Sequence, residues 1–314
     1  MASLYETNYQ FTGQTGFRRG KVRDIYEIRY TYLVLITTDR ISAYDRILSE
    51  TIPYKGQVLT GISDFMFRHF QPKVPTAWLS TPDPNVIIMR RARMYPVEVI
   101  VRRCLVGYLW RLYRAGGRII SGVRLPEGLI ENDLLPEPII TPTTKSVIGH
   151  DVEISEKEIL ETGLVPPSHW EAIRAYALEL FRGGMEIAEK GGMLLCDAKY
   201  EFGEIDGQVV LADEVHTPDS ARYLKLEGYY ERQARRDPQI HLTKEYIREW
   251  LMRQGFQGQP NATPPPLEVE VLREARDRYV EVYQRLLGQP FRPRNYKSIQ
   301  EEIYAHVEAA LEQL

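Results

Sequence analysis

Residues 197–219 read DAKYEFGEIDGQVVLADEVHTPD, a pattern that predicts a β-hairpin. Because successive side chains of a strand point to opposite faces, Asp197, Lys199 and Glu201 would share one face, and mostly apolar or aromatic side chains would occupy the other. Carboxylate oxygens suit Mg²⁺ and an ammonium group suits phosphate, so this face has the groups that a Mg-ATP site requires. A solvated outer face of an amphipathic hairpin is the alternative that alternation alone leaves open.

The length of the hairpin loop decides whether the acid on the return strand joins this face. A two-residue turn would pair Glu201 with Ala212 and place Asp213 on the opposite face. A three-residue loop centred on Gly207 would pair Glu201 with Asp213, so that both carboxylates could bind one metal ion. Since glycine suits the left-handed position that such a loop needs, we expect the three-residue loop.

The composition is that of an ordinary globular protein, with 43% apolar and 26% charged residues in a chain of 314. A net charge of −3 gives no general reason to expect a nucleic-acid partner. The two cysteines, Cys104 and Cys196, lie far apart in sequence and suggest neither a disulfide framework nor a zinc site. No apolar run reaches the roughly 18 residues of a membrane span, and the first ten residues lack a signal-peptide core. We therefore expect a cytoplasmic protein without a membrane partner.

The order of periodic segments predicts an α+β protein. Strands are expected at 21–28, 32–38, 86–94 and 97–103, with a crossing helix at 56–70, which together suggest a mostly antiparallel N-terminal lobe. Outside the hairpin, the second half of the chain reads as mixed and mainly helical.

Three later helices carry capping-box starts: Ser155 with Glu158, Ser168 with Glu171, and Ser298 with Glu301. The helix from about 169 to 190 presents an apolar stripe that indicates a core position. A further helix, from about 267 to 287, would end at Gly288.

Residues 13–22, GQTGFRRGKV, are rich in glycine and basic residues and precede a predicted strand. They do not form a Walker A loop, because three residues rather than four separate Gly16 from Gly20, and Val22 stands where Ser or Thr would bind the metal. A strand-turn-strand loop that covers phosphates, as in kinase-like folds, fits better. A plain hairpin turn would explain the segment about as well.

Eight motifs in a fixed order resemble the SAICAR synthetase (phosphoribosylaminoimidazole-succinocarboxamide synthase) family of de novo purine biosynthesis: GKVRDIYEI, TDRISAYD, KGQVLTGIS, PVEVIVRR, GYLWRLY, PEPIITPTTK, DAKYEFG and DEVHTPDSAR. The resemblance runs from about Gly16 to Gly288 and implies that family's fold, with an N-terminal lobe similar to a kinase nucleotide-binding lobe. It also implies a ligase that uses ATP and Mg²⁺. Such an enzyme joins L-aspartate to the carboxylate of CAIR (5-amino-1-(5-phosphoribosyl)imidazole-4-carboxylate) and releases SAICAR, ADP and phosphate, through an acyl phosphate.

The resemblance assigns roles around the nucleotide residue by residue. The positions implied for nucleotide binding are Gly20, Lys21, Val22, Met94, Glu98 and Lys199. Lys199 and Asp197 are implied as catalytic residues, and Glu201 and Asp213 as Mg²⁺ ligands. Four positions of TDRISAYD lie near the site in the family without a firm individual role: Asp39, Arg40, Ser42 and Asp45.

The implied substrate-binding positions are Arg102, Tyr108, Lys145, Asp151, Asp219, Ser220 and Arg222. The two arginines match cations that bind the CAIR phosphate, for which a guanidinium fork is well suited. Two departures from the family's usual pattern remove a small hydroxyl near this phosphate: Tyr108 follows Gly107, and Ala221 precedes Arg222, where serines are usual. We expect a reshaped phosphate pocket with retained activity.

The implied organisation is an ATP-binding lobe at 1–115, a mixed lobe at 116–288 with the metal hairpin and substrate loops, and a helical extension at 289–314. The partners would be the two small-molecule substrates, with no nucleic acid, in a monomer or a homodimer. An ATP-dependent small-molecule kinase on a similar fold is the alternative, although no HRD-type catalytic loop or DFG motif is present. A non-catalytic RNA-binding module is a poorer fit, because the local arginines lack interleaved aromatic platforms.

Overall fold

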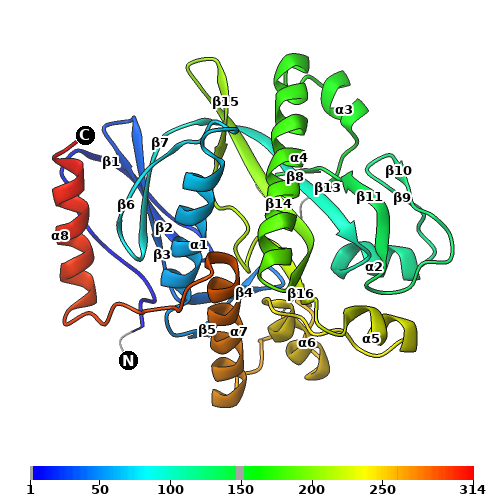
Figure 1. Cartoon of the computed structure of the whole chain (residues 1–314). Helices are drawn as coiled ribbons and strands as arrows, with labels where there is room; N and C mark the ends of the chain where they lie inside the picture. The colour runs from blue at the N-terminus through cyan, green and yellow to red at the C-terminus, as the bar shows by residue number, and fades with distance from the viewer. Residues whose placement is uncertain (1–2, 146–151, 260) are drawn as a thin grey trace. The chain divides into compact units, whose positions relative to one another are not determined.

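The computed structural model describes residues 3–145, 152–259 and 261–314 (Figure 1). The chain forms two compact units. The first contains Met1–Arg68, Ala77–Arg91 and Leu242–Leu314, and the second contains His69–Thr76 and Ala92–His241. Both contain helices and antiparallel sheets, so the predicted α+β class is confirmed. The units divide the chain differently from the predicted lobes, since residues 289–314 belong to the first unit and residues 92–115 to the second.

The first unit is built on a five-stranded antiparallel sheet with the order β1-β2-β3-β7-β6. Its central strands are rich in Val, Ile and Leu, which suit a buried sheet, and Val34, Ile36, Val86 and Ile88 are fully buried. The strands are β1 (Gln14–Arg19), β2 (Arg23–Ile28), β3 (Tyr32–Thr37), β6 (Trp78–Asp83) and β7 (Val86–Arg90).

Helix α8 (Ile299–Leu311) packs against β6 of this sheet (Figure 1). Ile303, Val307 and Leu311 recur every four residues, form one stripe of the helix and enter the hydrophobic core of the sheet. The segment predicted as an added extension is therefore part of the core. The remaining elements of this unit are β4 (Arg40–Ala43), β5 (Arg46–Thr51), α1 (Lys55–Phe70), α6 (Glu245–Arg253) and α7 (Val269–Leu287).

The second unit has a seven-stranded sheet centred on two long strands, β8 (Arg93–Cys104) and β14 (Met193–Ile205). Helix α4 (Pro167–Lys190) packs on β14 through the predicted apolar stripe, which is buried. The other strands of this sheet are β11 (Leu134–Ile140), β12 (Thr143–Thr144), β13 (Val152–Glu153), β15 (Gln208–Ala212) and β16 (Ala221–Lys225). Strands β9 (Ile119–Ile120) and β10 (Val123–Arg124) form a separate two-stranded sheet. The other helices are α2 (Gly107–Arg114), α3 (Glu156–Glu161) and α5 (Tyr229–Arg235). In the part of the chain described, no helix is long and apolar enough to span a bilayer.

The hairpin of β14 and β15 has a two-residue loop, so the predicted three-residue loop was wrong. The register pairs Glu201 with Ala212, and only Asp206 and Gly207 connect the strands. Both have positive φ, 52° and 79°, as the favoured two-residue hairpin turns require. Aspartate tolerates the left-handed region, so Asp206 can take the first positive-φ position of the turn beside Gly207. The prediction considered only the glycine.

One of the three predicted capping boxes forms. Ser155 and Glu158 make the reciprocal contacts at the start of α3. Helix α4 begins at Pro167, one residue before the predicted cap, because the fixed φ of proline suits the first helical turn. Helix α8 begins after Ser298 as expected, but the Ser298 N–H donates to Glu302, at 3.2 Å, rather than to the predicted partner.

Candidate active site

Strand β14 carries a line of charged side chains on one face. Its pairing with β8 is regular from Asp197 to Glu201, so Asp197, Lys199 and Glu201 share that face, as alternation predicted. The Lys199 ammonium lies 2.7 Å from Glu201 Oε1 and 2.8 Å from Oε1 of Glu98 on β8. Lys145 donates to the second oxygen of Glu201. We call Glu98, Lys145, Lys199 and Glu201 the lysine–carboxylate cluster.

The lysine–carboxylate cluster balances two acids against two bases in a poorly solvated place. Glu98 and Glu201 lie directly opposite across the two strands and are 8% and 6% exposed, an arrangement of like charges that is unfavourable alone. Burial would raise the pKa of Glu201, but the ammonium groups of Lys199 and Lys145 hold it well below its usual range. Burial opposes the charge of Lys199 as well, yet Glu201, Glu98 and Asp213 raise its pKa well above the usual value. The shifted pKa values therefore keep both Glu201 and Lys199 charged at neutral pH.

Asp213, the second predicted metal ligand, directly follows the end of β15. Its φ of 61° is left-handed, so strand alternation ends there and the hairpin loop no longer decides which side its carboxylate takes. The charge of Asp213 contributes to the raised pKa of Lys199, which shows that it acts on the cluster. Over residues 3–145, 152–259 and 261–314, no group of three or more His, Cys, Asp or Glu side chains forms a ready metal site.

The N-terminal end of the same face holds two arginines on one carboxylate. Asp197 Oδ2 accepts from Arg222 Nη1 at 2.7 Å and from Arg102 Nη1 at 3.3 Å. Arg102 Nε also donates to Thr141 Oγ1, at 2.8 Å. Arg102 and Asp197 are 5% and 3% exposed, so the excess positive charge is poorly solvated. We call Arg102, Asp197 and Arg222 the arginine group, which suits an anionic ligand.

Helix α2 begins beside the arginine group. A Cβ on Gly107 would lie only 2.7 Å from the guanidinium carbon of Arg222, and the φ of Gly107 is 55°, so glycine is required there. The next residue, Tyr108, is 42% exposed and donates its hydroxyl to Glu153 Oε1 at 2.5 Å. Both Glu153 and Tyr108 act electrostatically on Arg102. Sequence reasoning selected Tyr108 but missed Glu153, because nothing in the sequence links β13 to α2.

The turn before β16 brings two further predicted residues to the same strand. Ser220 O accepts from the Lys199 N–H at 2.9 Å, and the Ser220 hydroxyl lies 3.2 Å from Thr217 Oγ1. Thr217 Oγ1 also accepts from the Asp219 N–H, at 3.2 Å, and donates to Glu214 at 2.6 Å. Thr217 therefore ties the predicted substrate loop to β14, a role that the sequence did not indicate.

Met94, at the start of β8, is 39% exposed and pairs with Gly203. A Cβ on Gly203 would lie 3.1 Å from Met94 Sδ, so the glycine keeps space for this side chain. An exposed thioether can make favourable contacts with an aromatic ring. Asp151, the remaining predicted substrate residue, lies outside the described residues.

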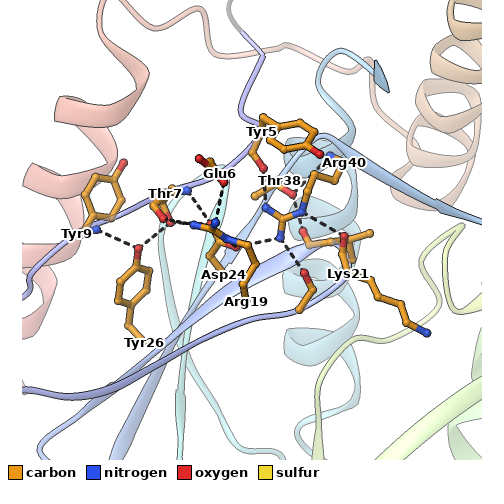
Figure 2. A network of polar contacts seen from close by, with 12 residues as sticks. Tyr5, Glu6, Thr7, Tyr9, Arg19, Lys21, Asp24, Tyr26, Thr38 and Arg40 are labelled. Atoms are coloured by element: carbon orange, nitrogen blue, oxygen red, sulfur yellow. Dashed lines mark hydrogen bonds and ion pairs between the residues drawn. The ribbon is translucent and has the colours of Figure 1, made fainter. Parts of the chain in front are cut away.

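Of the predicted glycine-rich segment 13–22, residues 14–19 form strand β1, and only residues 20–22, which we call the glycine loop, form the turn to β2 in the first unit (Figure 2). The Gly20 N–H donates to Arg23 O at 2.7 Å and closes the turn. The ammonium of Lys21 is exposed and pairs with Asp45. Arg40, to which the resemblance assigned no firm role, is 1% exposed and contacts the loop backbone.

Comparisons with known proteins agree on one family. A family model described as SAICAR synthetase matches residues 16–264. A phosphoribosylaminoimidazole-succinocarboxamide synthase of Bacteroides thetaiotaomicron is 44% identical over 308 residues, covering 98% of each chain. One of Cytophaga hutchinsonii is 43% identical over 311 residues, covering 99% of this chain and 100% of the relative.

Solved structures show the same relationship. A SAICAR synthase from Saccharomyces cerevisiae, complexed with SAICAR, is 29% identical with a TM-score of 0.76, covering 88% of this chain and 96% of its own. A SAICAR synthetase in complex with ADP has a TM-score of 0.68 at 23% identity, covers 88% of this chain and 100% of its own, and shares the fold.

Proposed function

The chain belongs to the SAICAR synthetase family, and from that premise we propose how its residues carry the family's reaction. That reaction joins L-aspartate to the carboxylate of CAIR and converts ATP to ADP and phosphate. The observation that carries the proposal is the shared face of β14, where Lys199 and Glu201 of the lysine–carboxylate cluster and Asp197 of the arginine group lie on one strand. One end suits a metal-bound nucleotide phosphate and the other a phosphorylated substrate.

An acyl phosphate makes the chemistry feasible, because a carboxylate oxygen is a poor leaving group. The substrate carboxylate attacks the γ-phosphorus of ATP, and the bond from that phosphorus to the bridging oxygen breaks to release ADP. The aspartate amine then attacks the acyl carbon, the C–N bond forms, phosphate leaves and the nitrogen loses a proton. These steps need charge neutralisation and alignment, which would come from the Lys199 ammonium on β14.

The lysine–carboxylate cluster fits a hard cation, because Glu201 is a buried carboxylate that already forms ion pairs with Lys145 and Lys199. We propose that Glu201 and Asp213 would hold Mg²⁺, which would supply charge neutralisation for the nucleotide phosphates. Glu98 would contact the ribose and Met94 the adenine. In the first unit, Gly20, Lys21 and Val22 would contact the phosphates, supported by the exposed ammonium of Lys21.

The arginine group would bind the phosphate of CAIR through Arg102 and Arg222. Because Asp197 Oδ2 is engaged by both guanidinium groups, we propose that Asp197 positions them, in place of the catalytic role first predicted. Tyr108 stays a proposed substrate contact with its hydroxyl turned to Glu153. Lys145, Asp151, Asp219 and Ser220 complete the proposed substrate residues, with Lys145 supported by its contact with Glu201.

The deciding experiment is an ADP-release assay in which CAIR and aspartate are each omitted in turn. Release that requires both substrates supports the ligase. Release that continues without aspartate and CAIR, when a polyol is supplied, favours a kinase.

Sedimentation of the purified protein would decide between the proposed monomer and the proposed homodimer. We also propose a cytoplasmic location, because ATP and aspartate are supplied there.

A further inference from the structure

A buried guanidinium supports the glycine loop within the first unit (Figure 2). All three nitrogens of Arg40 donate to backbone oxygens: Nε to Lys21 at 3.1 Å, Nη1 to Tyr5 at 2.5 Å and Nη2 to Gly20 at 3.0 Å. Nη2 also pairs with Asp24 Oδ1 at 2.9 Å, and the Asp24 side chain is fully buried. A buried pair with this many hydrogen bonds has a fixed geometry.

The carbonyl groups of Gly20, Lys21 and Val22 all point toward buried donors of the first unit. Arg40 binds those of Gly20 and Lys21. The carbonyl of Val22 accepts from both the N–H of Thr38, at 2.9 Å, and its hydroxyl, at 2.8 Å. Thr38 is fully buried, so this contact is as well fixed as that of Arg40.

The geometry of the peptide group then places two N–H groups on the other side. In a trans peptide the N–H points opposite to the C=O, so the N–H groups of Lys21 and Val22 point away from the Arg40 guanidinium. Neither N–H has an acceptor among the described residues. Adjacent N–H groups of this kind form an anion-binding concavity, and the exposed Lys21 ammonium adds positive charge beside them.

We propose that Arg40 and Thr38 are positioning residues that aim the N–H groups of Lys21 and Val22 at a nucleotide phosphate. The inference rests on the proposed nucleotide role of the loop. In this arrangement the loop recognises phosphate through its backbone, and the side chain at Val22 is free to vary. The alternative is that Arg40 only anchors the N-terminal segment through Tyr5 O, in which case its replacement lowers stability without changing phosphate affinity.

The test compares ADP with adenosine as ligands of folded variants, by calorimetry. Arg40→Lys keeps a charge beside Asp24 but cannot hold both carbonyls, and we expect ADP to bind about tenfold more weakly. Thr38→Val removes one of two hydrogen bonds to Val22 O, and we expect about a threefold loss. Adenosine affinity should stay unchanged, since adenosine has no phosphate.

Thr37→Val is the matched control. Thr37 is also buried, at the end of β3 directly before Thr38, but its hydroxyl is bonded to Thr60 and not to the loop. Thr37→Val should lower the free energy of unfolding about as much as Thr38→Val does, and it should leave the ADP affinity unchanged. If Thr38→Val and Arg40→Lys bind ADP as tightly as the parent, the positioning role is wrong while the proposed function stands.

A second measurement reads the two N–H groups directly. In amide-resolved NMR of the whole chain, ADP should shift the Lys21 and Val22 signals downfield, and adenosine should not. Absence of that shift in a protein that binds ADP would overturn the inference, even if Arg40→Lys proved too unstable to study. A parent protein that binds no ADP at all would overturn the nucleotide role itself.

Discussion

We propose that the glycine loop and the charged face of β14 bind phosphate by different physical means. The loop offers backbone N–H groups whose direction is set by buried support from Arg40 and Thr38. The β14 face offers side-chain charges that are buried and mutually neutralised. A single substitution can remove a side-chain charge, whereas a backbone donor can be disturbed only through the residues that hold it. The two regions should therefore differ in how steeply they respond to mutation and to pH.

The largest effect is expected on the β14 face. Glu201→Gln removes the carboxylate that binds Lys199 and Lys145 and that we propose as a metal ligand. Turnover should fall by about a thousandfold or more, corresponding to about 4 kcal/mol of transition-state stabilisation. The measurement is kcat in the ADP-release assay, with Glu227→Gln, an exposed acid beyond β16, as the control. Full activity of Glu201→Gln would refute the metal assignment.

A smaller effect is expected at the arginine group, where binding rather than turnover should suffer. Arg222→Ala leaves Asp197 paired with Arg102 alone and removes one proposed phosphate contact. The KM for CAIR should rise by about 10- to 100-fold with kcat little changed, the cost of one charge-assisted hydrogen-bonded contact. Steady-state kinetics with CAIR varied decide this. A drop in kcat at an unchanged KM would instead place Arg222 in the chemical step.

Replacing the acid beside the arginine group, Glu153, should change the KM for CAIR in the opposite direction to replacing Arg222. Glu153 receives the Tyr108 hydroxyl and its charge acts on Arg102, so it opposes an incoming phosphate. Glu153→Gln should lower the KM for CAIR by about threefold, because screening limits the effect of a partly exposed charge. Inhibition by inorganic phosphate should strengthen in parallel. Glu161→Gln, a more distant exposed acid on α3, is the control, and a raised KM in Glu153→Gln would mean that Glu153 binds substrate.

The smallest effect concerns the pH dependence of stability. The pKa of Glu201 is depressed on folding, so its charge stabilises the fold above the unfolded-state pKa, and this contribution is lost as pH falls through the folded-state pKa. The destabilisation caused by Glu201→Gln should therefore shrink between pH 7 and pH 3. That of Thr38→Val should stay constant, since no titrating group is changed. Urea unfolding of both variants across this range provides the comparison, and parallel curves would contradict it.

The sequence predicted local features well where a local rule decides them. Alternation placed Asp197, Lys199 and Glu201 on one face, and the Ser155 box and the Gly288 helix end were both correct. The hairpin loop was wrong because two turn types compete closely, and the choice depends on whether Asp206 accepts a left-handed backbone.

Contacts between segments that are far apart in the sequence could not be predicted from it. The opposition of Glu98 and Glu201 depends on the register between β8 and β14, which are about 100 positions apart. The contact of Tyr108 with Glu153 and the burial of Arg40 beneath the glycine loop likewise require distant segments to meet. Residue types that look like surface charges in the sequence therefore acquire their roles only from tertiary structure.

The packing of α8 has a consequence for the order of folding during synthesis. Ile303, Val307 and Leu311 complete a core that also contains Leu4 and Phe11, so strands β1 to β3 cannot bury their core face until the much later α8 has been made. The second unit draws on a nearly continuous stretch of chain and can close earlier. The sheet of β1, β2, β3, β6 and β7 is therefore completed only after α8 has been translated, and a chain truncated before α8 would leave the core of that sheet open.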